Sequence, residues 1–97
     1  MFNAMMVNPN DNVAVVIEVI SKGDLVIIKM EGDTKELEAK EAIPIYHKVA
    51  ISDIPCSWAV IKYNEQIGIA LKDIKMGTHV HTHNLGSKMI ECEGEQL

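Results

Sequence analysis

The chain has 97 residues, 47% of them hydrophobic and 24% charged, which suits one small globular domain with a modest core. Fourteen acidic residues against nine basic ones give a net charge of −5 with no Lys/Arg cluster, so nucleic-acid binding is not expected. No apolar stretch approaches the roughly 18 residues of a membrane span, and the N-terminus lacks the basic and apolar regions of a secretory signal.

Short runs rich in Val and Ile, separated by Gly, Pro and charged residues, predict strands rather than helices. In chain order the predicted strands cover residues 13–20, 25–30, 43–51, 58–63, 66–72 and 79–83. Residues 33–42 are rich in Glu, Lys and Ala, but Leu37 stands nearly alone among charged neighbours, so an exposed strand and a helical turn fit equally well. Asn64 is expected to take positive φ in a hairpin turn, and Gly68 marks a bulge or a close backbone approach.

Ile followed six positions later by Val occurs four times, twice with Gly in the middle. The copies are Ile20–Val26, Ile43–Val49, Ile54–Val60 and Ile74–Val80. We interpret each copy as a corner, in which an apolar residue anchors the chain, the chain turns, and a strand leaves with Val pointing inward. The copies begin 23, 11 and 20 residues apart, too irregularly for a solenoid, so the pattern predicts a compact all-β domain, barrel-like or clip-like.

The domain is predicted to cover residues 8–86, with an N-terminal extension at 1–7 and a polar, acidic C-terminal tail at 87–97. Uncapped strand edges in so small a domain make a homo-oligomer possible. Cys56 and Cys92 follow no disulfide or metal-binding pattern, and without a secretory signal they predict reduced thiols in a cytoplasmic protein.

Three of the four histidines, His79, His81 and His83, alternate along the last predicted strand and therefore share one face of it. Along a straight strand neighbours are roughly 6.7 Å apart and the outer two about 13 Å, so two of them but not all three can bind one ion. Further ligands would have to come from elsewhere, for example from His47, Cys56, Glu65 or Asp73. A metal site, a solvated polar face and one wall of a site completed by another domain or subunit all stay open.

Two further stretches carry polar candidates. His47 and Lys48 follow Pro44 in the second corner, where an exposed turn with a solvated Lys is the alternative. Asn84 follows the last histidine, and its amide can both donate to and accept from a carboxylate or hydroxyl ligand.

Several separated motifs, in order, resemble one family. They are "NPNDNVAV", "IPIYHKVAI" and "VIKYNEQIGIALKDIKMGTHVHTHNL". They look like the SAF domain found at the N-terminus of altronate and galactarate dehydratases and as the separate small subunit of sulfolactate sulfo-lyase. The resemblance covers residues 8–85, with one departure at Asn64, where the family usually has Gly; both residues tolerate positive φ.

The resemblance implies a β-clip fold and a place in a lyase system that eliminates water or sulfite from beside a carboxylate. It implies a hydroxy-acid substrate, and iron(II) or another divalent metal held mainly by a partner. A large catalytic dehydratase subunit is expected to complete the site, so the chain is expected to be inactive alone. The main hypothesis is a small subunit or N-terminal-type domain of a sugar-acid dehydratase, a hydro-lyase. The alternatives are a sulfolactate sulfo-lyase small subunit and a freestanding module that binds a sugar acid or metal.

On this basis each candidate residue receives an expected role. The expected catalytic residues are His47, His81 and His83. The expected substrate-binding residues are Asn12, Lys48 and Asn84. The expected metal ligands are His79 and His81.

Overall fold

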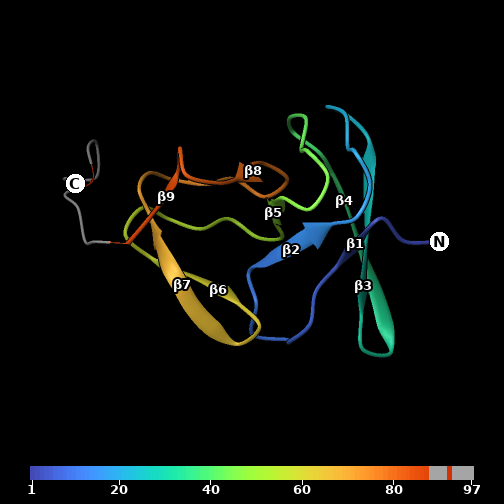
Figure 1. The fold of residues 1–97 in the computed structure, drawn as a ribbon, viewed down its shortest axis with the longest axis horizontal. Helices are drawn as coiled ribbons and strands as arrows, with labels where there is room; N and C mark the ends of the chain where they lie inside the picture. The colour runs from blue at the N-terminus through green and yellow to red at the C-terminus, as the bar shows by residue number, and fades with distance from the viewer. Residues whose placement is uncertain (88–91, 93–97) are drawn as a thin grey trace.

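Nine short strands and no helix make up the part of the chain that the structure, a computed structural model, describes: residues 1–87 and 92. The strands are β1 (Ala4–Met5), β2 (Val13–Val16), β3 (Leu25–Met30), β4 (Asp33–Glu38), β5 (Lys48–Ala50), β6 (Ala59–Lys62), β7 (Glu65–Ala70), β8 (His79–Val80) and β9 (Leu85–Gly86). They form a six-stranded sheet, β4-β3-β1-β2-β5-β8, and a three-stranded sheet, β6-β7-β9 (Figure 1). The predicted all-β class is confirmed.

Two segments that the sequence either left unassigned or placed outside the domain contribute strands to the larger sheet. Residues 33–38 form strand β4, antiparallel to β3, and only Leu37 of this strand is buried. Within the segment 1–7, Ala4 is fully buried and pairs with Val16 on one side and Ile28 on the other. Of the predicted tail at 87–97, only Ser87 and Cys92 lie within the described residues.

The four predicted corners meet in two pairs. Ile20 forms an isolated antiparallel bridge with Ile43, and Ile54 forms one with Ile74. Each of these Ile side chains is at most 2% exposed. The Val residues that end the four corners are fully buried: Val26, Val49, Val60 and Val80. An Ile anchor followed by an inward-pointing Val is therefore confirmed, and β3–β4 and β6–β7 are the equivalent hairpins between the paired corners (Figure 1).

All four corners also make the same turn. The third residue after each Ile has positive φ: Gly23 (90°), Tyr46 (71°), Ser57 (73°) and Gly77 (91°). The next N–H donates back across the turn, as from His47 to the carbonyl of Pro44 at 3.0 Å. Positive φ at the third position of such a turn is the type II geometry, which favours glycine there. Tyr46 and Ser57 take this conformation despite their side chains.

Two apolar cores lie on opposite sides of the β2–β5–β8 part of the sheet. Because strand side chains alternate, Ala14 and Val49 point into the first core, and Val13 and Ala50 into the second. Val80 of β8 also belongs to the second core. The residues flanking Val80 in sequence therefore emerge on the first-core side, and these are histidines.

Cys56 and Cys92 form a disulfide, with their Cα atoms 6.0 Å apart. The prediction of reduced thiols is therefore wrong, and that argument for a cytoplasmic location no longer applies. Their separation of 36 residues carries no pattern that would have revealed the pairing. No helix in residues 1–87 or at residue 92 has the length and apolar character needed to cross a membrane.

Candidate functional site

The pairing of β5 with β8 brings distant histidines together. The strands run antiparallel with Val49 opposite His79, and extending this register by two residues along each strand places His47 opposite His81. Because alternate residues share a face, His47, His79 and His81 emerge on the same side of the sheet. The turn of the second corner ends at His47, which is the residue directly before β5.

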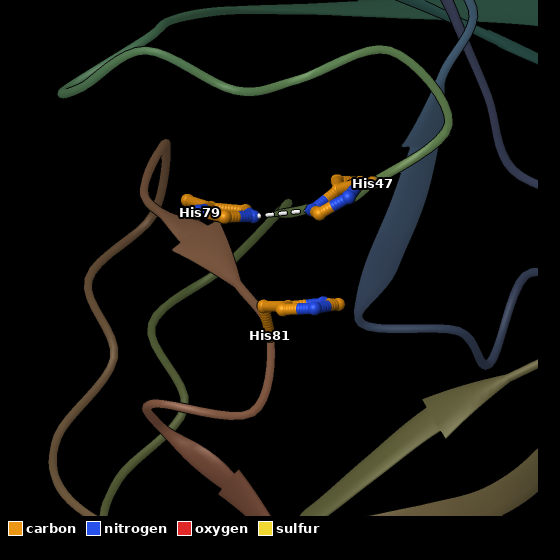
Figure 2. Close-up of side chains that lie close together, drawn as sticks. All are labelled: His47, His79 and His81. Carbon is orange, nitrogen blue, oxygen red and sulfur yellow. Dashed lines mark hydrogen bonds between the residues drawn. The ribbon is translucent and has the colours of Figure 1, made fainter.

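The three imidazoles are in contact. Nδ1 of His47 lies 2.8 Å from Nε2 of His79, and the rings of His47 and His81 stack with their centroids 4.3 Å apart (Figure 2). One ring nitrogen from each residue lies within 4.8 Å of those of the other two. All three side chains are half-buried. The expected proximity of His47 to His81 is confirmed.

The chain bends directly after β8. The strand predicted for 79–83 ends at Val80, and the N–H of Asn84 closes a turn by donating to the carbonyl of His81 at 3.0 Å. The bend brings the ring centroid of His83 to 5.2 Å from that of His79, whereas a straight strand would separate these residues by about 13 Å. The prediction of a straight strand over 79–83 is therefore wrong. All four histidines of the chain form one cluster, which we call the histidine cluster.

The buried side chain of Asn84 stabilises this bend. Its side chain is 3% exposed, accepts a hydrogen bond from the His81 N–H at 2.9 Å and donates to the His79 carbonyl at 2.8 Å. Both ends of the amide are thus engaged by the backbone that carries the histidines. The structure therefore gives Asn84 a positioning role, which the sequence prediction of a substrate contact had not anticipated.

The electrostatics around His79 favour its neutral form. Burial lowers its pKa from the ordinary 6.5, and the neighbouring His47, His83 and His81 lower it further, while Glu41 acts in the opposite direction. The Glu41 carboxylate accepts the His79 backbone N–H at 2.8 Å. Glu41 was missed by the sequence analysis, because nothing in the sequence relates position 41 to position 79. A neutral imidazole is the form that binds metal ions.

Lys48 and Asn12 lie away from the histidine cluster. Lys48 is paired with Val80, so its side chain leaves β5 on the second-core side. Burial and the charge of Lys62 lower the pKa of Lys48. Asn12 uses its side chain to join β2 to β6, donating to the Ala59 carbonyl at 2.9 Å and accepting the Ile61 N–H at 2.7 Å.

The donor set of His47, His79 and His81 fits a divalent first-row metal ion. Imidazole suits zinc, iron, copper and nickel, and three histidines with an open position are a recurrent catalytic arrangement. Nitrogens bound tetrahedrally at 2.0–2.1 Å lie about 3.3 Å apart, so a spread of up to 4.8 Å closes with small ring rotations. The predicted pair of His79 and His81 thus gains His47 as a third candidate ligand.

Comparison with known proteins shows the family of the chain. Residues 2–88 match the altronate/galactarate dehydratase SAF domain. The chain belongs to this family. It is 40% identical over 76 residues to the (2R)-sulfolactate sulfo-lyase subunit alpha of Chromohalobacter salexigens, a match covering 76% of this chain and 81% of the relative.

Two further SAF-domain relatives differ sharply in length. The (2R)-sulfolactate sulfo-lyase subunit alpha of Paracoccus pantotrophus is 42% identical over 64 residues, which is 66% of this chain and 96% of the relative. The altronate dehydratase of Escherichia coli is 35% identical over 83 residues, which is 86% of this chain but only 16% of the relative. The resemblance seen in the sequence motifs is therefore confirmed. The alpha-subunit relatives also imply a partner subunit in those enzymes.

Proposed function

We propose that the chain is the small subunit of a two-subunit lyase that eliminates sulfite from a sulfonated 2-hydroxy acid, with the histidine cluster as one wall of the active site. The observation that carries this proposal is sequence similarity: the chain is 40% and 42% identical to the two sulfo-lyase alpha subunits, in matches that cover 81% and 96% of them. The identity with the altronate dehydratase is lower, 35% over 83 residues. We therefore prefer the sulfo-lyase hypothesis to the sugar-acid dehydratase hypothesis.

The reaction requires few groups. A base takes the proton from the carbon beside the carboxylate, its electron pair forms a carbon–carbon double bond, and the carbon–sulfur bond breaks with its pair leaving as sulfite. The enol product then rearranges to a 2-oxo acid. A neutral imidazole suits the base, and cationic or hydrogen-bonding groups must stabilise the charge on the emerging enolate.

Within the cluster we assign different tasks to different histidines. His83 is exposed and lies beyond the trio, so it is the candidate proton carrier. His47, His79 and His81 would hold a divalent ion, with iron(II) as the candidate, which when bound supplies Lewis-acid stabilisation of developing negative charge. Asn84 keeps the bend that presents His81 and His83, and Asn12 keeps β2 against β6; both support the site without a substrate contact of their own.

A second candidate function is a component of a sugar-acid hydro-lyase. It is favoured by the 35% identity with the E. coli altronate dehydratase. Both reactions begin by removing a proton beside a carboxylate, and they differ in the leaving group. Hydroxide needs an acid to leave, whereas sulfite leaves as a stable anion, so the two functions place different demands on the partner subunit.

The test is reconstitution of this chain with the large lyase subunit from the same genome. Product formation is measured with (2R)-sulfolactate, altronate and galactarate, for each subunit alone and for both together. The proposal predicts sulfite release from sulfolactate only when both subunits are present. Dehydration of altronate or galactarate without sulfite release would establish the second candidate instead, and a chain that neither binds nor activates the large subunit would be a freestanding module.

A further inference from the structure

Each pair of corners leaves a groove on the surface where its Ile–Ile bridge meets solvent, and the two grooves differ. The groove at the Ile54–Ile74 bridge has a volume of about 160 Å³ and is flanked by Asp53 and Asp73. The groove at the Ile20–Ile43 bridge has a volume of about 490 Å³. Its wall is formed by Val19, Ala42, Pro44, Ile45 and His79, together with the bridge residues. We call the second one the apolar groove.

In the smaller groove, carboxylates cross-link the two corners. Asp53, directly before Ile54, accepts the Met76 N–H at 2.8 Å. Asp73, directly before Ile74, accepts the Cys56 N–H at 2.9 Å. The arrangement is reciprocal, because each acceptor precedes its bridge Ile and each donor is the second residue after the opposite bridge Ile.

The apolar groove has the same backbone plan without these carboxylates. The residues before Ile20 and Ile43 are Val19 and Ala42. The equivalent donors are the N–H groups of Lys22 and Ile45, and neither finds an acceptor within residues 1–87 and 92. Val19 is 70% exposed and Ile45 is 40% exposed. The apolar groove therefore has apolar walls and two backbone N–H groups with no acceptor among the described residues. In the smaller groove, Asp53 and Asp73 accept the equivalent N–H groups.

We propose that the large lyase subunit docks in the apolar groove with an apolar side chain and two carboxylates, which accept hydrogen bonds from the Lys22 and Ile45 N–H groups. The inference rests on the proposed function, which requires such a subunit. The partner carboxylates take the places that Asp53 and Asp73 occupy in the smaller groove. Since His79 lines the apolar groove and belongs to the histidine cluster, a subunit seated there covers the cluster at the same time.

Tyr46 supports this assignment independently. It follows Ile45 at the rim, is 70% exposed and has φ of 71° at a position where two of the four equivalent corners have glycine. Exposed aromatic side chains are frequent anchors at protein interfaces. An exposed aromatic ring next to Ile45 of the apolar groove fits an interface anchor.

The first experiment measures amide hydrogen exchange of the wild-type chain, free and in complex with the large subunit. Docking in the apolar groove slows exchange at Lys22 and Ile45 at least tenfold, while Met76 and Cys56 are already protected in the free chain. Unchanged exchange at Lys22 and Ile45 in an active complex would overturn the inference and leave the proposed function standing. Protection of these amides in the chain alone, rising with concentration, would identify a second copy as the occupant and also overturn it.

The second experiment compares Val19→Asp with Val7→Asp, an identical change at a residue that is 58% exposed and outside the apolar groove. The new carboxylate at position 19 can accept the Ile45 N–H as Asp53 accepts that of Met76, so the groove closes on itself. Affinity for the large subunit, measured by titration calorimetry, falls at least tenfold for Val19→Asp alone. Equal affinities for both variants and wild type would contradict the inference, and no binding by wild type would end both the inference and the proposed function.

Discussion

Nδ1 of His47 lies 2.8 Å from Nε2 of His79, although 32 residues separate them in the chain. One nitrogen must donate and the other accept, so the contact cannot persist when both rings are doubly protonated. The pair depends on the turn of the second corner, which ends at His47, and on the pairing of β5 with β8. It joins the two histidine-bearing segments into one site (Figure 2).

Removing one member of the trio should weaken metal binding. His47→Ala, His79→Ala and His81→Ala each delete a candidate ligand, and we expect affinity for Zn²⁺ or Co²⁺ to fall by more than the roughly 10–100-fold that loss of an outer-shell partner causes. His83→Ala is the matched control, since His83 lies outside the trio. Calorimetric titration and metal analysis of the dialysed proteins measure the effect. Equal metal affinity in all four variants would contradict the assigned ligand set.

The stability of the metal-free chain should depend on the charge of His79. Its pKa is lowered in the folded state, so below the unfolded value of 6.5 the unfolded chain binds more protons than the folded one. This contribution to the free energy of unfolding is fully present above pH 6.5 and is lost as the pH falls through the folded-state pKa. Urea unfolding between pH 5 and 8 should show a shallower pH dependence for His79→Gln than for wild type. An unchanged slope would show that His79 titrates alike in both states.

Two glycines with the same backbone conformation should respond differently to alanine. Gly23 and Gly77 have φ of 90° and 91°, so each substitution carries the left-handed penalty of about 1–2 kcal/mol. A Cβ at Gly23 meets nothing within 4 Å, whereas one at Gly77 runs into the Glu38 carbonyl oxygen and lies 3.1 Å from Cγ of Lys40. Gly77→Ala should therefore cost a further 1–3 kcal/mol or so in the free energy of unfolding, as overpacking does. Equal losses in chemical denaturation would show that the close approach is not retained in solution.

Asn84→Ala should reduce both stability and metal affinity. The change removes two hydrogen bonds of a buried amide and leaves backbone partners at His79 and His81 unsatisfied, at a cost of about 1–3 kcal/mol. With the bend loosened, His81 is no longer held against His47, so metal binding weakens although no ligand is removed. Asn10→Ala, which loses one exposed contact to Asn64, is the control and should change stability by less than about 0.5 kcal/mol. A loss of stability without a loss of metal affinity would show that Asn84 does not position the cluster.

Local patterns in the sequence predicted local structure well. The Ile-to-Val spacing identified all four corners, and the hairpin turn has Asn64 at φ of 63° as expected. The pairing register shifts between Val60 and Ile61, opposite the segment that contains Gly68. A Cβ at Gly68 would lie 2.5 Å from the carbonyl oxygen of Gly86, which confirms the predicted close backbone approach. The corners and the hairpin turn depend on residues a few positions apart, so composition and spacing are sufficient to detect them.

The site depended on contacts that the sequence does not encode locally. The end of β8 at Val80 follows from the Asn84 amide, whose hydrogen bonds to His79 and His81 compete with a continued strand. The contribution of Glu41 and the disulfide partner of Cys56 each require knowledge of the tertiary fold. The grouping of His47 with His81 was expected only from the family resemblance. Strand alternation alone predicted that His79, His81 and His83 lie spread along one straight strand. In the structure the chain bends after β8, so these histidines lie close together.

The most direct test of the histidine cluster as an active-site wall is the rate of sulfite release from (2R)-sulfolactate by the complex of His81→Ala with the large subunit. His81 lies in the trio but is not one of the residues that line the apolar groove, so the complex should still form. We predict that sulfite release falls at least about 100-fold relative to the wild-type complex, because His81 is one of three candidate ligands of an ion that would stabilise the developing negative charge by several kcal/mol. A variant complex that forms normally and releases sulfite at the wild-type rate would contradict the account.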